Sequence, residues 1–155
     1  MADSIKEKIL KSVTEDLGII SMATGYSNDI QLVERWEQLG QNKASLPAIF
    51  VHTGSEAKEN RPSIVTHCKL VVYAVLWAIH DRNAFPVPTD EYLNLFAADI
   101  EKALMVDEQR DQLAERTTVT DIDFFELQEG QAFVGVIVEM SIEYKHKRGD
   151  PYTQL

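Results

Sequence analysis

Hydrophobic and polar residues alternate most regularly near the end of the chain, and this alternation predicts a long β-strand. Even positions from 134 to 144 are apolar or aromatic, while the odd positions between them are polar or glycine except at Ile137. Successive side chains of a strand point to opposite faces of a sheet, so one face of this strand is expected in a core. The preceding segment Thr117–Leu127 is rich in Thr, Ile and Phe, and we expect it to pair with this strand as a hairpin around Glu129-Gly130.

The segment from 63 to 80 also predicts a strand, but the character of one face changes along its length. Even positions from 64 to 78 are apolar apart from Thr66, which indicates one buried face. The odd positions are mostly polar up to Lys69 and apolar from there to Ile79. The second half must therefore be covered on both faces, by a helix of the same chain or by a neighbouring subunit. The candidate subunit interface consists of Val71, Tyr73, Val75 and Trp77.

Two segments carry apolar residues at helical spacing. Ser4 and Glu7 have the spacing of a capping box, and apolar positions then recur every three or four residues until Gly18. A second helix is expected from residue 89 onward, with Thr89 as a possible cap and with apolar positions between 93 and 104 on one face. Asp99 falls on the opposite, polar face of this helix.

Two shorter segments complete the expected secondary structure. Ile30–Trp36 fits a strand, although a helical turn is also compatible with it, and residues 48–52 form an apolar run after Pro47. The resulting order is helix, short strand, strand, long strand, helix, strand, strand. It predicts an α+β fold, a small α/β-type domain in which two main helices pack on one face of a mostly antiparallel sheet of about four to five strands. We expect a single domain over residues 1–155, with 149–155 as a short exposed C-terminal tail.

Charge and cysteine content restrict the function and the compartment. The chain has 15 basic and 25 acidic residues, a formal net charge of −10, so a broad nucleic-acid footprint is not expected. The single Cys68 excludes an intrachain disulfide and fits a reducing compartment. The charged first residues lack the apolar region of a secretory signal, and the longest apolar run, Leu70 to Ile79, is about half of a membrane span. A soluble cytoplasmic protein without a membrane partner is the expectation.

Motifs of known catalytic meaning do not occur in the sequence. It has no glycine-rich phosphate loop, no paired-histidine zinc helix and no G-x-S-x-G element. The histidines at 52, 67, 80 and 146 lack the one-turn spacing of metal ligands, and Cys68 on an apolar strand face is expected to be a small buried residue. We therefore predict no catalytic, cofactor-binding or metal-ligating residue, and no enzymatic activity.

One constellation leaves a metal-dependent nuclease as a remote alternative. Asp121 or Asp123 on one hairpin strand, with Glu143 and Lys145 on the next, resembles the acid and E-x-K arrangement of such enzymes. Two carboxylates of this kind hold Mg²⁺ while the lysine orients the attacking water. Charged residues at alternate positions are also expected on the polar side of any strand, and a net charge of −10 would repel DNA.

The C-terminal segment combines basic residues with a turn and an aromatic residue. After the closing strand, Gly149-Asp150-Pro151 favours a turn, and the aromatic Tyr152 follows in an otherwise exposed tail. A basic cluster on an acidic protein steers acidic partners, and exposed aromatic residues are enriched in contacts. A solvated strand end is the simpler alternative. The predicted docking residues are Lys145, Lys147, Arg148 and Tyr152.

Short sequence pieces follow one another in a distinctive order between about Ile30 and Tyr152. They are V-E-R-W at Val33–Trp36, L-P-A-I-F-V at Leu46–Val51, Gly54 with Glu56, the long apolar strand, D-I-E-K-A-L at Asp99–Leu104, and the closing I-E-Y-K-H-K-R-G-D-P-Y. In this order, and with a final strand that ends in R-G-D-P-Y, the chain resembles the tail terminator proteins of long-tailed bacteriophages.

The resemblance implies a small α/β subunit that forms a hexameric ring on the last ring of the tail tube, stops its polymerisation and offers a surface to the head connector or neck protein. It implies a structural virion protein without cofactors, present in the host cytoplasm during assembly and then in the tail–neck region. DNA would only pass through the lumen of the ring. A neck, tail-completion or head–tail adaptor protein with a similar small fold is the nearest alternative.

Overall fold

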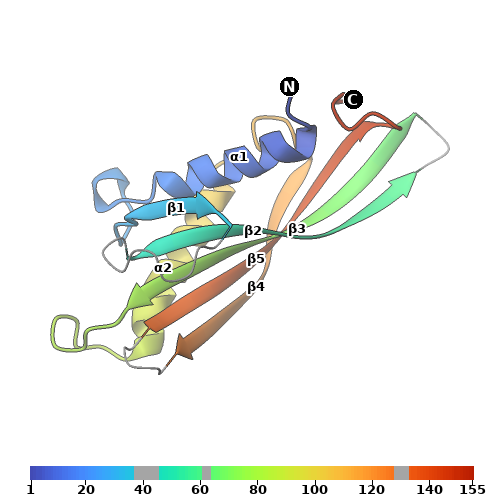
Figure 1. The fold of residues 1–155 in the computed structure, drawn as a ribbon. Coiled ribbons are helices and arrows are strands. Elements are labelled where there is room, and N and C mark those ends of the chain that lie inside the picture. The colour runs from blue at the N-terminus through green and yellow to red at the C-terminus, as the bar shows by residue number, and fades with distance from the viewer. Residues whose placement is uncertain (37–45, 61–63, 128–132) are drawn as a thin grey trace.

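The computed structural model describes residues 1–36, 46–60, 64–127 and 133–155, which form two α-helices and five strands (Figure 1). The order of elements is the predicted one, with a strand rather than a helical turn after Ile30. In the described part of the chain, neither helix has the length and apolar character needed to cross a membrane. The elements are α1 (Ile5–Gly18), a short 3-10 helix (Met22–Thr24), β1 (Leu32–Arg35), β2 (Ala48–Asn60), β3 (Val65–Ile79), α2 (Thr89–Met105), β4 (Arg116–Leu127) and β5 (Phe133–Lys147).

The five strands form one mixed sheet in the order β1-β2-β3-β5-β4. β1 runs parallel to β2, whereas the other neighbouring pairs are antiparallel. β4 pairs with Phe133–Glu143 of β5, as expected of a hairpin, while Glu129-Gly130 lies outside the described residues. The predicted α+β fold, a mostly antiparallel sheet with two helices, is therefore confirmed.

Both helices pack on one face of the sheet, which we call the helix face. The even-numbered side chains of β3 and β5 point into this layer and are buried, as their alternation predicted. They join the apolar faces of α1 and α2 in one continuous core. Burying a Val, Leu or Ile side chain contributes about 1.5–3 kcal/mol, so this layer is the main source of stability. Its fully buried strand residues include Leu70, Val72, Ala74, Leu76, Val136, Val138, Met140 and Ile142.

The two helices begin in different ways. Ser4 Oγ accepts a hydrogen bond from the Glu7 N–H at 3.2 Å, so α1 has the predicted cap. At α2 the cap position is Pro88, and Thr89 is already helical, so the prediction that Thr89 caps α2 is wrong. The Thr89 hydroxyl lies instead 3.2 Å from Nδ1 of His80, because the chain after β3 folds back over the start of α2.

The N- and C-terminal segments meet at the same end of the sheet (Figure 1). The Ile5 N–H donates a hydrogen bond to the Pro151 carbonyl oxygen at 3.1 Å. A free N–H of the first helical turn is thus satisfied by the other end of the chain. The turn after β5 and the start of α1 consequently stabilise each other.

Candidate interaction surface

The face of the sheet opposite the helices, which we call the open face, is not covered by either described helix. Odd-numbered residues of β3 and β5 point to it, and the strand register aligns them in rows with residues of β2 and β4. One row contains Ala48, Trp77, Gly135 and Phe125, and the next contains Phe50, Val75, Ile137 and Asp123. A third row contains His52, Tyr73, Glu139 and Asp121.

One half of the open face is apolar. Its large side chains are each partly exposed, whereas the alternate residues of β3 and β5 on the helix face are buried. All four residues of the predicted subunit interface lie in this half. The alternative that a helix of the same chain covers them is wrong for α1 and α2, because both helices pack on the other face. The open-face patch, as we call it, consists of Phe50, Val71, Tyr73, Val75, Trp77, Phe125, Phe133 and Ile137.

Aromatic rings order one end of the open-face patch. Trp77 meets Phe125 with ring centroids 4.8 Å apart and planes inclined by 71°, and it meets Phe133 at 6.5 Å and 78°. Gly135 lies between Trp77 and Phe125 in the same row. A Cβ at this glycine would lie 2.1 Å from Cζ of Phe125. The absence of a side chain at Gly135 therefore provides the space that the Phe125 ring occupies.

Two polar atoms of the open face are buried without a hydrogen-bond partner among the described residues. They are Nε1 of Trp77 and Oγ of Ser141, and Ser141 is only 7% exposed. A buried polar group without a partner costs about 1–3 kcal/mol. Both atoms are enclosed within the chain itself, so this cost belongs to the packing of the open face.

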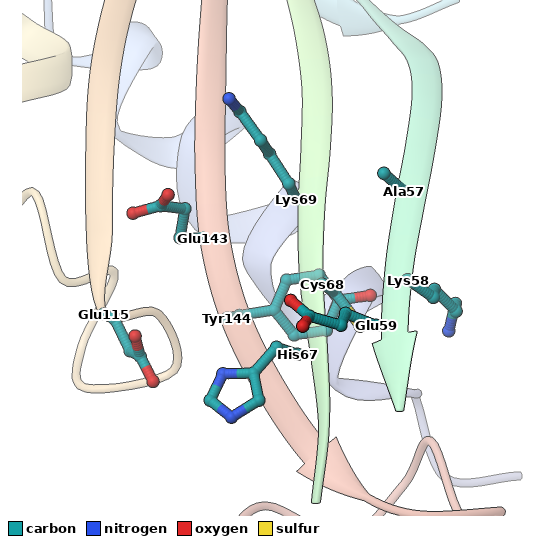
Figure 2. Close-up of a pocket in the computed structure, with 9 residues that line it drawn as sticks. All are labelled: Ala57, Lys58, Glu59, His67, Cys68, Lys69, Glu115, Glu143 and Tyr144. Atoms are coloured by element: carbon teal, nitrogen blue, oxygen red, sulfur yellow. The ribbon is translucent and has the colours of Figure 1, made fainter. Parts of the chain in front are cut away.

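The other half of the open face is charged and contains an open pocket of about 370 Å³ (Figure 2). His67 of β3 and Glu143 of β5 line it, together with Glu115 immediately before β4. Glu143 accepts from Arg116 at 2.7 Å, and Lys145 lies 3.8 Å from Glu115. Within the described ranges, no group of three His, Cys, Asp or Glu side chains is arranged to hold a metal ion.

The strand register separates the residues of the nuclease alternative. Asp121 lies opposite Glu139 of β5, and Asp123 lies farther toward the hairpin. Glu139 and Glu143 are four residues apart, a distance of about 13 Å along a strand. Metal–oxygen distances in Mg²⁺ sites are about 2 Å, so Asp121 and Glu143 do not share one ion in this arrangement.

A polar cluster lies beside the pocket on the helix face, where Tyr144 and His146 are buried, Glu56 is half-buried and Lys58 is exposed. Tyr144 donates its hydroxyl hydrogen to Glu56 at 2.6 Å, and Lys58 Nζ lies 3.3 Å from the same carboxylate and 3.2 Å from His146 Nε2. Burial, together with the adjacent Glu56 carboxylate, raises the pKa of Tyr144. Burial also raises the pKa of the Cys68 thiol, which is buried as predicted. These groups satisfy one another, so the cluster stabilises this end of the sheet.

The C-terminal residues form an ordered turn. Asp150 accepts hydrogen bonds from the Tyr152 N–H at 3.1 Å and from the Thr153 hydroxyl at 2.7 Å. These two bonds lower the pKa of Asp150. The predicted tail 149–155 is exposed except for Asp150, which is half-buried, but hydrogen bonds hold it against the body of the protein. We call Lys147–Tyr152 the cationic turn.

The four predicted docking residues differ in their exposure and in their ion pairs. Lys147 and Arg148 are exposed, and neither forms an ion pair with another described residue. Tyr152 is 57% exposed. Lys145 is half-buried and faces Glu115 of its own chain. Three of the four residues are therefore available at one end of the molecule to contact a partner.

Arg110 is a structural residue that no sequence pattern revealed. Its side chain is fully buried and donates hydrogen bonds to Asp16 of α1, to the Leu104 carbonyl oxygen and to the Thr117 hydroxyl. It thereby joins α1, the end of α2 and β4. Burial raises the pKa of the Asp16 carboxyl despite the facing guanidinium. Arg110 also has a positive φ of 50°, a conformation that is unfavourable for L-residues.

Asp99 of α2 is buried, although the sequence placed it on the polar face of this helix. The residue is only 4% exposed, so its placement on the solvent side was wrong. Its carboxylate accepts hydrogen bonds from the N–H groups of Ser27 and Asn28 at 3.0 and 2.9 Å. Lys102 donates to the Gly25 carbonyl oxygen at 2.9 Å. The loop after α1 therefore folds onto α2, and a contact across about seventy residues of sequence buries Asp99.

No protein-family model matches the sequence, and no curated protein matches it. The described residues form a distinctive surface, with an apolar sheet face that neither described helix covers at one end and an ordered cationic turn at the other. Function is therefore inferred from this surface and from the sequence resemblance.

Proposed function

We propose that this chain is a structural protein of a long-tailed bacteriophage, a tail terminator that forms a ring, caps the tail tube and ends its polymerisation. The resemblance over about Ile30 to Tyr152 supplies the family, the hexameric ring and the partners, which are the tail-tube protein and the head connector or neck protein. The same ring would offer the joining surface for the head. DNA would pass through its lumen without being bound.

The observation that carries this proposal is the open-face patch. Eight large apolar side chains lie side by side on a sheet face that neither described helix covers. Apolar surface of this kind marks a protein–protein interface more often than it faces water. In a ring, each copy covers the patch of its neighbour.

The charge of the chain supports the passage of DNA. A subunit with a net charge of −10 repels phosphate, so a ring of such subunits is suited to a channel through which DNA moves without adhering. Nuclease activity has the weaker case, because Glu143 pairs with Arg116 and lies far from Asp121 along the strands. Mg²⁺-dependent DNA cleavage by the wild-type chain that is lost in Glu143→Gln would contradict the structural role.

Growth of the tail tube tests the proposal. Tail-tube protein of the same phage is polymerised from short seeds with and without the chain, and tube lengths are measured by electron microscopy. We expect the wild-type chain to stop elongation when one ring is present for each tube end. Trp77→Glu should not stop it, whereas Leu95→Glu, at an exposed position of α2, should act as wild type.

Two outcomes would contradict termination. Tubes that grow to the same length with and without the wild-type chain would contradict it directly. Binding to the head connector without binding to the tube would instead favour the head–tail adaptor alternative. The assay therefore separates the two candidate functions by the partner that the chain recognises.

A further inference from the structure

The open face carries an acidic margin beside its apolar patch. Asp121 and Asp123 of β4 are exposed, and Glu139 of β5 lies opposite Asp121. None of these three residues forms an ion pair with another described residue, although Glu139 accepts a hydrogen bond from Thr120. We call these three residues the acidic margin. They leave uncompensated negative charge next to the surface that the proposed ring would bury.

The cationic turn has the opposite charge and begins at the end of β5, whereas Glu139 of the acidic margin lies near the middle of that strand. Gly135, in the row of Trp77, and Lys147 are twelve residues apart on β5, which corresponds to about 40 Å. Many cations of this chain are already paired internally, as Arg35 is with Glu7 and Arg116 with Glu143. Lys147 and Arg148 are not paired within the described ranges, so their charge is available to a partner.

We propose that the cationic turn of one copy docks on the open face of the next copy, with Lys147 and Arg148 against the acidic margin and Tyr152 on the open-face patch. This docking rests on the proposed ring, and it identifies the two surfaces that the ring joins. Charge complementarity selects a second copy as the occupant, because each copy carries both halves of the contact.

The placement of the two surfaces also suits a ring. A contact between two different surfaces of the same chain is heterologous, and it produces a closed ring or an open filament rather than a two-fold dimer. Tyr152 is an exposed aromatic residue whose backbone N–H donates to Asp150, so little backbone freedom is lost when it docks.

Charge reversal tests the docking. The turn-reversed variant carries Lys147→Glu and Arg148→Glu, and the margin-reversed variant carries Asp121→Lys and Asp123→Lys. In each variant the two surfaces have the same sign, so we expect association to weaken at least tenfold at low salt, as measured by light scattering over a concentration series. Glu91→Lys with Glu101→Lys, on exposed positions of α2, is the matched control and should associate as wild type.

Mixing the two variants gives the sharper result. The reversed turn of one variant is complementary to the reversed margin of the other, and their unchanged surfaces are complementary as well. An equimolar mixture should therefore assemble with alternating copies, and a chain that carries all four substitutions should assemble alone. Thermal unfolding of each variant checks that the fold is retained. Tyr152→Ala should weaken association even at salt concentrations that screen the charges.

The possible failures are distinguishable from one another. If both reversed variants assemble as wild type does, the proposed docking contact is wrong, whereas the proposal of a ring is not contradicted. If the turn-reversed variant assembles normally but loses binding to tail tubes or to the connector, the turn contacts that partner ring and the docking is again wrong. If wild-type chains do not associate with or without tail tubes, the docking and the proposed function both fail.

Discussion

Trp77 and Phe125 meet edge to face across Gly135, with ring centroids 4.8 Å apart. Their strands β3 and β4 are not neighbours, so the contact passes over β5 at a position without a side chain. Aromatic pairs of this geometry contribute about 0.5–1.5 kcal/mol beyond the area that they bury. The pair holds one end of the open-face patch in a fixed shape before any partner binds.

Gly135→Ala should therefore destabilise the protein. The new Cβ would lie 2.1 Å from the Phe125 ring and 2.3 Å from the Leu76 carbonyl oxygen, and the backbone oxygen cannot move aside cheaply. We expect the free energy of unfolding in urea to fall by about 1–3 kcal/mol, the usual range for overpacking. Gly18→Ala is the control, because a Cβ at Gly18 meets no atom within 4 Å. Equal stability of the two variants would contradict the described packing of Phe125.

Arg110→Met should destabilise the protein more than the same substitution at an exposed arginine. Removal of the buried guanidinium leaves the Asp16 carboxylate and the Leu104 carbonyl oxygen without this donor. Breaking a buried ion pair typically costs about 3–5 kcal/mol, so we expect a loss of this size in urea unfolding. Arg116→Met breaks an exposed pair and should cost about 1 kcal/mol or less.

A second variant checks the cause of this loss. Asp16→Leu combined with Arg110→Met removes both charges, and it should be more stable than Arg110→Met alone, because no carboxylate is then left unpaired. A combined variant that is no more stable than the single one would assign the loss to packing rather than to the ion pair.

The sheet face to which each residue of the long strands β3 and β5 points was predictable from the sequence. The alternation in β3 and β5 has a period of two, which is a local property of extended backbone. It separated the buried even positions from the odd positions and marked the apolar stripe at Val71 to Trp77. Phe50, Phe125 and Phe133 were not assigned to the same patch, because the register between strands is a long-range property that no single segment contains.

The missed and misplaced residues have a common physical origin. Asp99 fits the polar face of a helix by its spacing, but the loop at Ser27 and Asn28 folds over it and buries it. Arg110 stands in a stretch without apolar periodicity, and its burial depends on three elements that meet around it. The parallel pairing of β1 with β2 is likewise set by tertiary contacts. Local patterns indicate faces, and they do not indicate which distant segment covers a face.

Acidification should loosen the cationic turn. The pKa of Asp150 is lowered from its usual 3.8 by hydrogen bonds from Thr153 and Tyr152, so its ionised form stabilises the turn above that value. This contribution is lost as the pH falls below 3.8 through the lowered pKa of the folded state. We expect the NMR signals of Tyr152 and Thr153 to shift toward those of an unstructured end in this range.

Asp150→Asn should produce part of this change at neutral pH, because an amide has only one acceptor oxygen and no charge. Asp90→Asn, in the first turn of α2, is the control and should leave the signals of the turn unchanged. Turn signals that are the same in Asp150→Asn as in wild type would show that Asp150 does not hold the turn.

The mass of the chain in solution, measured by light scattering with and without tail tubes, tests most directly whether the open-face patch joins copies in a ring. We predict about 106 kDa for a wild-type ring of six 17.6 kDa chains, and the same mass for the control Leu95→Glu. Trp77→Glu should remain at 17.6 kDa, and Val75→Thr, a milder polar change in the same patch, should shift the balance toward single chains if Trp77→Glu does not fold. A folded Trp77→Glu chain that assembles to the wild-type mass would contradict this role of the open face.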